Sequence, residues 1–142
     1  MSTTDIRSEG DKPYYKDIQF VEMKLRGHDR VISFERVGSS DQLFAVARTL
    51  GDTLHVWLSD VYTLGEAEFL FLREKNPEIN CIVSVSGYNR YTDEAKEQAV
   101  RDRVGLFKIG EFLGALNVKE FWTYVPRPTT DRDSKSNRRR GA

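Results

Sequence analysis

The stretch that decides the fold of this chain is Leu43-Phe44-Ala45-Val46-Ala47-Arg48, followed by Leu54-His55-Val56-Trp57-Leu58. Both runs are rich in residues that β-strands favour, and Gly51-Asp52 between them is a strong turn signal. We therefore predict a β-hairpin with strands over residues 43–49 and 53–58. A third run, over residues 79–85, is nearly continuous in β-branched side chains, which predicts a strand buried on both faces.

Upstream of the hairpin, the pattern predicts one more strand and a helix. Val31-Ile32-Ser33-Phe34 indicates a strand within residues 30–36. Residues 15–26 carry apolar side chains at helical spacing, although a period of two also fits part of this segment. We favour the helix, because Gly27 then ends it.

Downstream, helices alternate with strands. Asn76-Pro77 ends a helix predicted over residues 64–75. Thr92, followed by acids that suit a first helical turn, begins a second helix that runs to Arg103. The remaining elements are a short strand over 105–109, a helix over 111–116 and a last edge strand over 121–125.

These elements predict an α/β fold, with a mixed sheet of four to five strands flanked by helices on both faces. A length of 142 residues makes a single domain the expectation, and we place it over residues 14–125. Residues 1–13 and 126–142 are polar and lack apolar runs, so we expect disorder in both segments.

The chain also carries residues in an order known from a family of nucleases. Ser40-Asp41 precedes the hairpin, Ser84-Val85-Ser86-Gly87 ends the buried strand, Ala95 and Ala99 follow, and Gly110-Glu111-Phe112-Leu113 comes last. This succession resembles the Mrr-type branch of the PD-(D/E)XK restriction-endonuclease-like superfamily. The resemblance covers residues 15–116 and implies a restriction-endonuclease-like mixed sheet.

The residues that bind metal in that family lack counterparts in this chain. The family's acid, which shortly precedes a Val-Ala pair, falls on Phe44, and its Gln-x-Lys or Glu-x-Lys falls on Trp57 and Ser59. None of these three side chains can hold a divalent cation or supply the lysine. We expect Phe44 and Trp57 to fill the place of the metal. The leading hypothesis is therefore a non-catalytic pseudo-nuclease, without a cofactor, that serves as a nucleic-acid- or protein-binding accessory module.

Two alternatives stay open. A Mg²⁺-dependent endonuclease would need a migrated site, built from Asp41, Asp60 and Glu66 or from Glu22 and Lys24. These acids also fit turn chemistry or a solvated helix face. The other alternative is a protein-binding subunit of a defence, phage or mobile-element complex.

Polar residues at the end of the buried strand form a candidate binding site. Ser86, Tyr88, Asn89 and Arg90 lie where a strand turns into a helix, the place where α/β sheets bind ligands. Hydroxyls, an amide and a guanidinium there could hold an anion such as a backbone phosphate. The same residues also fit an ordinary turn.

Charge is unevenly spread along the chain. Residues 126–142 hold six Lys/Arg and two Asp, including Arg138-Arg139-Arg140, whereas the other residues hold 16 basic and 20 acidic side chains. Nucleic acid, if bound, should therefore contact this basic tail. A solubilising end or an anchor for an acidic protein also fits. Trp122 and Tyr124, beside the tail, are candidates for an exposed contact with a protein partner or a second copy.

Composition excludes several classes of protein. Cys81 is the only cysteine, so it forms no internal disulfide, and we expect a small buried side chain. No apolar run approaches the length of a membrane span. The first 17 residues are polar and contain no secretory signal. We expect a cytoplasmic protein with no contact to membranes.

Overall fold

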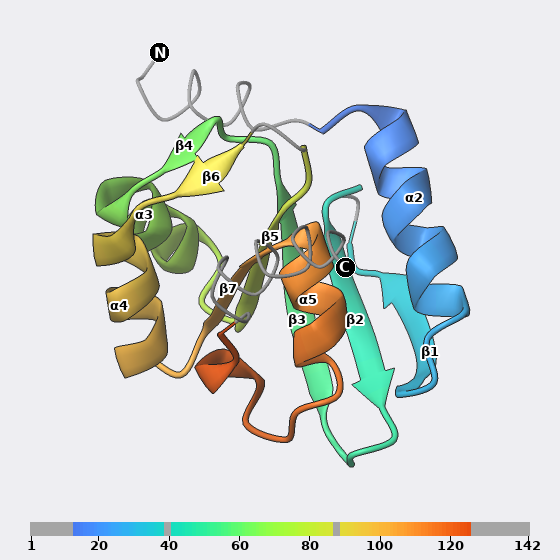
Figure 1. The fold of residues 1–142 in the computed structure, drawn as a ribbon. Helices are drawn as coiled ribbons and strands as arrows, with labels where there is room; N and C mark the ends of the chain where they lie inside the picture. Colours follow the sequence, from blue (N-terminus) through green and yellow to red (C-terminus); the bar gives the residue numbers. More distant parts are fainter. Residues whose placement is uncertain (1–12, 39–40, 87–88, 126–142) are drawn as a thin grey trace, which may run out of the picture.

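The computed structural model describes residues 13–38, 41–86 and 89–125, and a five-stranded sheet forms its centre. In spatial order the strands are β1 (Val31–Arg36), β2 (Leu43–Arg48), β3 (Thr53–Ser59), β5 (Cys81–Ser84) and β7 (Gly105–Lys108) (Figure 1). β1, β2 and β3 are antiparallel neighbours, whereas β3, β5 and β7 run parallel. The sheet is therefore mixed, and the predicted α/β class is confirmed.

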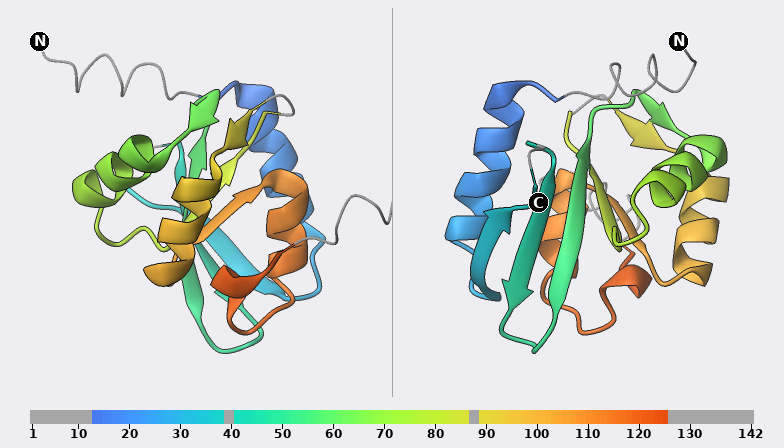
Figure 2. Two further views of the ribbon diagram at one scale, coloured as in Figure 1. Left: turned by 60° about the vertical axis from the view of Figure 1, so that its left-hand side comes forward. Right: turned by 180° about the vertical axis from the view of Figure 1, so that it is seen from behind.

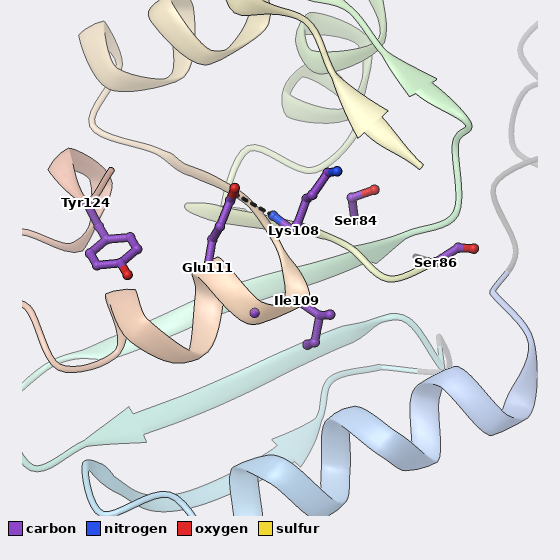
Figure 3. Close-up of a pocket in the computed structure, with 7 residues that line it drawn as sticks. Ser84, Ser86, Lys108, Ile109, Glu111 and Tyr124 are labelled. Carbon is purple, nitrogen blue, oxygen red and sulfur yellow. Dashed lines mark hydrogen bonds between the residues drawn. The ribbon is translucent and has the colours of Figure 1, made fainter. Parts of the chain in front are cut away.

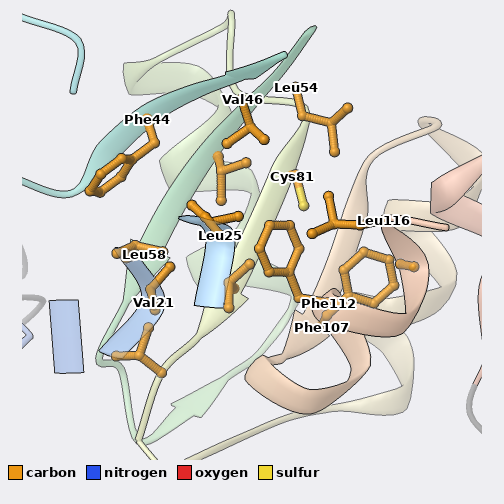
Figure 4. Close-up of a cluster of buried hydrophobic side chains, with 14 of the residues drawn as sticks. Val21, Leu25, Phe44, Val46, Leu54, Leu58, Cys81, Phe107, Phe112 and Leu116 are labelled. Carbon is orange, nitrogen blue, oxygen red and sulfur yellow. The ribbon is translucent and has the colours of Figure 1, made fainter. Parts of the chain in front are cut away.

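Helices cover both faces of this sheet. α2 (Tyr15–Arg26) and α5 (Ile109–Ala115) lie on one face, and α3 (Glu66–Lys75) and α4 (Asp93–Arg101) lie on the other (Figure 2). The core under α2 and α5 includes Val21, Leu25, Phe44, Val46, Phe107 and Phe112 (Figure 4). The core under α3 and α4 includes Phe69, Leu72, Ile82, Ala95, Ala99 and Leu106. β2, β5 and β7 thus bury side chains on both faces of the sheet.

The three helices with predicted end signals have them where expected, and Asn76 follows the last residue of α3. α2 buries Ile18, Val21 and Leu25 and leaves Met23 exposed, which is the helical pattern and not the alternating one. It ends at Gly27, whose N–H donates to the carbonyl of Met23. At the start of α4, the hydroxyl of Thr92 accepts a hydrogen bond from the Ala95 N–H at 3.1 Å.

Two parts of the fold differ from the prediction. Thr63–Leu64 forms a short strand, β4, that pairs in parallel with β6 (Arg90–Tyr91), so α3 begins only at Glu66. A ladder of two residues leaves no periodic pattern in the sequence. The predicted edge strand over 121–125 is wrong: Phe121–Thr123 forms a 3₁₀ turn, η1, because the buried ring of Phe121 turns into the core instead of continuing an extended chain.

Arg48 is a buried charge at the end of β2, with 1% of its surface exposed. Its Nε and one Nη donate to the two carboxylate oxygens of Asp52 at 2.8 and 2.7 Å. The other Nη–H groups donate to the carbonyls of Leu116, Val118 and Lys119, at 3.0, 2.8 and 3.0 Å. The five N–H groups of the guanidinium are thereby all used. Arg48 therefore ties the β2–β3 turn to the loop that follows α5.

Removing this guanidinium should cost much of the stability of the domain. Arg48→Met leaves three carbonyls and Asp52 without their donor, so we expect a loss of about 3–5 kcal/mol in the free energy of unfolding. Urea denaturation measures the loss. Arg36→Met is the matched control, because Arg36 also pairs with two carboxylates but is 39% exposed. We expect the control to cost less than about 1 kcal/mol, and equal losses would contradict the role given to Arg48.

Asp52 should make stability depend on pH in acid. The hydrogen bond from Arg48 is the largest cause that lowers the pKa of Asp52 from its ordinary 3.8. A lowered folded-state pKa stabilises the fold above the unfolded pKa, and this contribution is lost as the pH falls through the folded value. Asp52→Asn should thus unfold at lower urea than the wild type at neutral pH, with the gap closing below pH 3.8. A gap that persists undiminished in strong acid would contradict this link.

Candidate functional site

Three parallel strands end at one edge of the sheet, and polar side chains gather there. In the ladders, Ser59 of β3 pairs with Ser84 of β5, and Ser84 pairs with Lys108 of β7. These three residues therefore form one row across the sheet at its carboxyl edge. Ser59 and Ser84 are buried, whereas Lys108 is exposed. Ligands of α/β proteins bind at this edge.

Asn89 directly precedes β6, which pairs with β4 in the small second sheet. Asn89 is 1% exposed, and its Nδ2 donates to Oδ1 of Asp60 at 2.9 Å. Its backbone N–H donates to the carbonyl of Ser86 at 3.1 Å. Asn89 thus fixes both the turn after β5 and the carboxylate that follows β3.

A second network surrounds the end of β7. The hydroxyl of Tyr91 donates to Oε1 of Glu111 at 2.7 Å, and the Lys108 N–H donates to the same oxygen at 2.9 Å. Burial, followed by the hydrogen bond to Glu111, raises the pKa of Tyr91 above its usual range. Burial also lowers the pKa of Lys96, whose Nζ donates to the carbonyl of Leu106 at 2.8 Å. Glu111 is thereby held in a fixed position beside Lys108.

A pocket of about 400 Å³ opens between these networks and α5 (Figure 3). It is lined by Ser84, Ser86, Lys108, Ile109, Gly110, Glu111 and Tyr124. Figure 3 shows the side chains of Ser84 and Lys108 extending in the same direction from neighbouring strands. The hydroxyl oxygen of Ser84 is buried and has no hydrogen-bond partner among the described residues. Buried hydroxyl groups usually form hydrogen bonds, so the hydroxyl of Ser84, unbonded among the described residues, makes this pocket a candidate ligand site.

The acids proposed for a migrated metal site are dispersed among other partners. Arg36 donates to Glu22 at 3.1 Å and to Asp41 at 3.1 Å, so a guanidinium lies between these two carboxylates. Glu66 is exposed on the first turn of α3, and Lys24 is exposed with its Nζ 5.4 Å from the centre of the Phe20 ring. Within the described ranges, no group of three or more His, Cys, Asp or Glu could hold a metal ion.

Asp60 has an acidic neighbour that the sequence did not single out. The pKa of Asp17, in the first turn of α2, is raised mainly by burial and further by the negative charge of Asp60. The two carboxylates therefore act on each other electrostatically, although they come from distant parts of the chain.

The positions that the nuclease resemblance assigns to catalysis lie in different surroundings. Phe44 is 1% exposed and belongs to the core under α2 and α5, with its ring centre 6.2 Å from that of Phe34. Trp57 is only partly buried and packs against the other core. The expectation that the two rings fill one place is therefore wrong. Phe44 pairs with Val56 and Leu43 pairs with Trp57, so alternation puts the rings on opposite faces.

The structure brings together some of the predicted binding residues. Ser86 lines the pocket, and the buried side chain of Asn89 bonds to Asp60 at the same edge. Arg90 is exposed, with its guanidinium 5.5 Å from the centre of the Tyr62 ring. Tyr88 and Arg138-Arg139-Arg140 lie outside the described residues.

Two residues with a predicted exposed contact are instead partly buried. Trp122 and Tyr124 pack against the core under α2 and α5. The ring of Tyr124 meets that of Phe107 edge-on, with 6.2 Å between centres. The sequence predicted exposure because both residues shortly precede a proline-rich segment. Instead, η1 packs this part of the chain against β7.

Sequence reasoning missed Lys108 and Glu111 as site residues. A local signal was present, because a glutamate three positions into a helix often accepts from the backbone N–H of the N-cap residue. Glu111 does this to Lys108. Their meeting with Tyr91 and Ser84 depends on strand order, which no local pattern carries.

A scan of protein-family models and searches of curated proteins and of solved structures each gave no match to this chain. The restriction-endonuclease-like resemblance therefore remains a prediction, whereas the structure confirms the α/β class. None of the described helices is long and apolar enough to cross a bilayer.

Substitutions at the two aromatic positions should differ in cost. Phe44→Ala removes a fully buried ring, so we expect a loss of about 3–5 kcal/mol in the free energy of unfolding. Trp57→Ala should cost less, because part of the indole is already exposed. Phe44→Asp should also destabilise, since it puts a carboxylate into an apolar core. Thermal melts compare the three variants, and a Phe44→Asp variant as stable as the wild type would contradict this placement.

Proposed function

We propose that this chain is a restriction-endonuclease-like domain that binds nucleic acid and does not cut it. One observation carries the proposal: the position that the resemblance assigns to the metal-binding acid is Phe44, which is 1% exposed inside a core. Restoring a carboxylate there would need a new core as well as a new side chain. The cytoplasmic location expected from the sequence is part of the same proposal.

Nucleic acid is supported as the ligand by the side chains at the carboxyl edge. Tyr62 is 57% exposed, and the exposed guanidinium of Arg90 lies over its ring, 5.5 Å from the ring centre. Exposed aromatic rings hold unpaired bases, and arginines hold phosphates. Lys108 and Ser86 add a cation and a hydroxyl on the same edge. The six Lys/Arg of residues 126–142 supply further phosphate contacts in this proposal.

The electrostatic effect of Asp60 on Asp17 favours a second candidate function. Two carboxylates are a common start of a Mg²⁺ site, and nucleic-acid phosphates supply further oxygen ligands in such enzymes. The raised pKa of Asp17 is the observation behind this alternative. It is a metal-dependent endonuclease whose site has migrated to the end of β3, with Mg²⁺ as the cofactor.

Binding should depend on Arg90 and not on a similar residue far from the edge. We expect Arg90→Ala to weaken binding of a fluorescent single-stranded oligonucleotide by about threefold to tenfold and to reduce the salt slope by about one. Anisotropy titrations at several salt concentrations give both values. Arg101→Ala is the control, because Arg101 is exposed in the last turn of α4. Arg138→Gln, Arg139→Gln and Arg140→Gln together test the tail.

A cleavage assay decides between the two candidates. The full chain is incubated with Mg²⁺ or Mn²⁺ and with single-stranded and duplex DNA and RNA. The proposal expects intact substrates. Cleavage that disappears in Asp60→Asn would replace the binding function by that of an endonuclease, and failure to bind any of these substrates would remove both.

A further inference from the structure

The carboxyl edge holds a cavity whose polar lining is incomplete without a ligand. Ser84 is 1% exposed, and its hydroxyl has no partner among the described residues. Its neighbour in the same row shows the usual arrangement, because the buried hydroxyl of Ser59 accepts from the Val61 N–H at 3.2 Å. An unbonded hydroxyl in a folded protein costs stability, so a partner at Ser84 offsets a penalty that the free protein bears.

The lining divides into a polar part and an apolar part. Ser84, Ser86 and the amine of Lys108 can bind an anionic group with adjoining oxygens. Ile109 and the ring of Tyr124 provide apolar surface for a flat body. Glu111 already accepts two hydrogen bonds on Oε1, which anchors it as an acceptor for a donor on the ligand. A ligand that matches has an anion, hydroxyl or amine donors and a ring.

The size of the cavity suits one such molecule. A volume of about 400 Å³ falls within the range of small-molecule sites. Gly110 leaves the cavity open, because a Cβ built on it meets no atom within 4 Å. A side chain at that position would thus clash with no atom, and because Gly110 lines the cavity we expect a leucine there to narrow it.

From these features we infer that the pocket binds a single nucleotide, with its phosphate at Lys108, Ser84 and Ser86 and its base against Ile109 and Tyr124. The inference rests on the proposed function, because it names the unit of nucleic acid that the domain holds at this edge. An unpaired nucleotide can enter such a pocket, whereas a base within a duplex cannot reach it.

Titration of the full-length, ¹⁵N-labelled protein with adenosine 5′-monophosphate and uridine 5′-monophosphate tests the inference. Adenosine and inorganic phosphate are separate arms. We expect saturable shifts of the amide signals of Ser84, Ser86, Lys108 and Gly110 with a nucleotide. Lys108→Gln should weaken binding of the nucleotide and leave that of adenosine unchanged.

Matched variants separate binding from stability. Ser84→Ala should weaken nucleotide binding by about tenfold, the worth of one good hydrogen bond. It should not lower the melting temperature, because the lost hydroxyl bonds to none of the residues that the structure describes. Ser59→Ala should do the reverse, lowering the melting temperature and leaving the affinity unchanged. Gly110→Leu should abolish binding while the protein stays folded.

Several outcomes would overturn the inference. They are the absence of saturable shifts at the pocket, unchanged affinity in both Ser84→Ala and Gly110→Leu, and inorganic phosphate binding as tightly as the nucleotides. Oligonucleotide binding by the wild type without mononucleotide binding rejects the pocket and leaves the proposed function intact. Mononucleotide binding that follows the expected variants, without oligonucleotide binding, supports the pocket and rejects the proposed function.

Discussion

The guanidinium of Arg48 joins parts of the chain that the sheet alone does not hold together. It pairs with Asp52 in the turn of the β2–β3 hairpin and donates to three carbonyls in the loop after α5. A buried charge is tolerated only where its donors find partners, and this one finds five. The loop fixed in this way leads into η1, which returns Phe121 and Tyr124 to β7. One wall of the pocket at the carboxyl edge therefore depends on a residue near the opposite end of the sheet.

The carboxyl edge combines fixed polar groups with groups that remain available. Asn89 holds Asp60, and Tyr91 holds Glu111, so two carboxylates have defined positions. Lys108 is exposed beside them, and the buried hydroxyl of Ser84 has no hydrogen-bond partner in the part of the chain that the structure describes. Such a contrast is typical of sites where stability has been exchanged for recognition. It makes this edge, and not the hairpin that the nuclease resemblance emphasises, the strongest candidate for a ligand.

The two faces of the sheet explain why the nuclease positions resist a simple interpretation. Phe44 and Trp57 are close along the hairpin, yet they belong to separate cores. Trp57 pairs with Leu43, the residue before Phe44, and successive side chains of a strand point to opposite faces. A metal site would draw its ligands from one face. Glu22 and Asp41 do lie near each other, but Arg36 lies between them and uses both. Beyond the effect of burial, the charge of Asp60 also acts on Asp17, whose pKa it raises, whereas the nearby Lys16 lowers it.

The sequence by itself determined the strands of the hairpin, both ends of α2, the start of α4 and the α/β class, because periodicity, turn residues and caps act over a few neighbouring residues. It also placed Ser86 and Asn89 at the end of a buried strand. Only the tertiary structure decided that Ser59, Ser84 and Lys108 form one row and that Tyr91 reaches Glu111. These meetings follow from strand order and register, which depend on how distant segments pack and leave no local pattern in the chain.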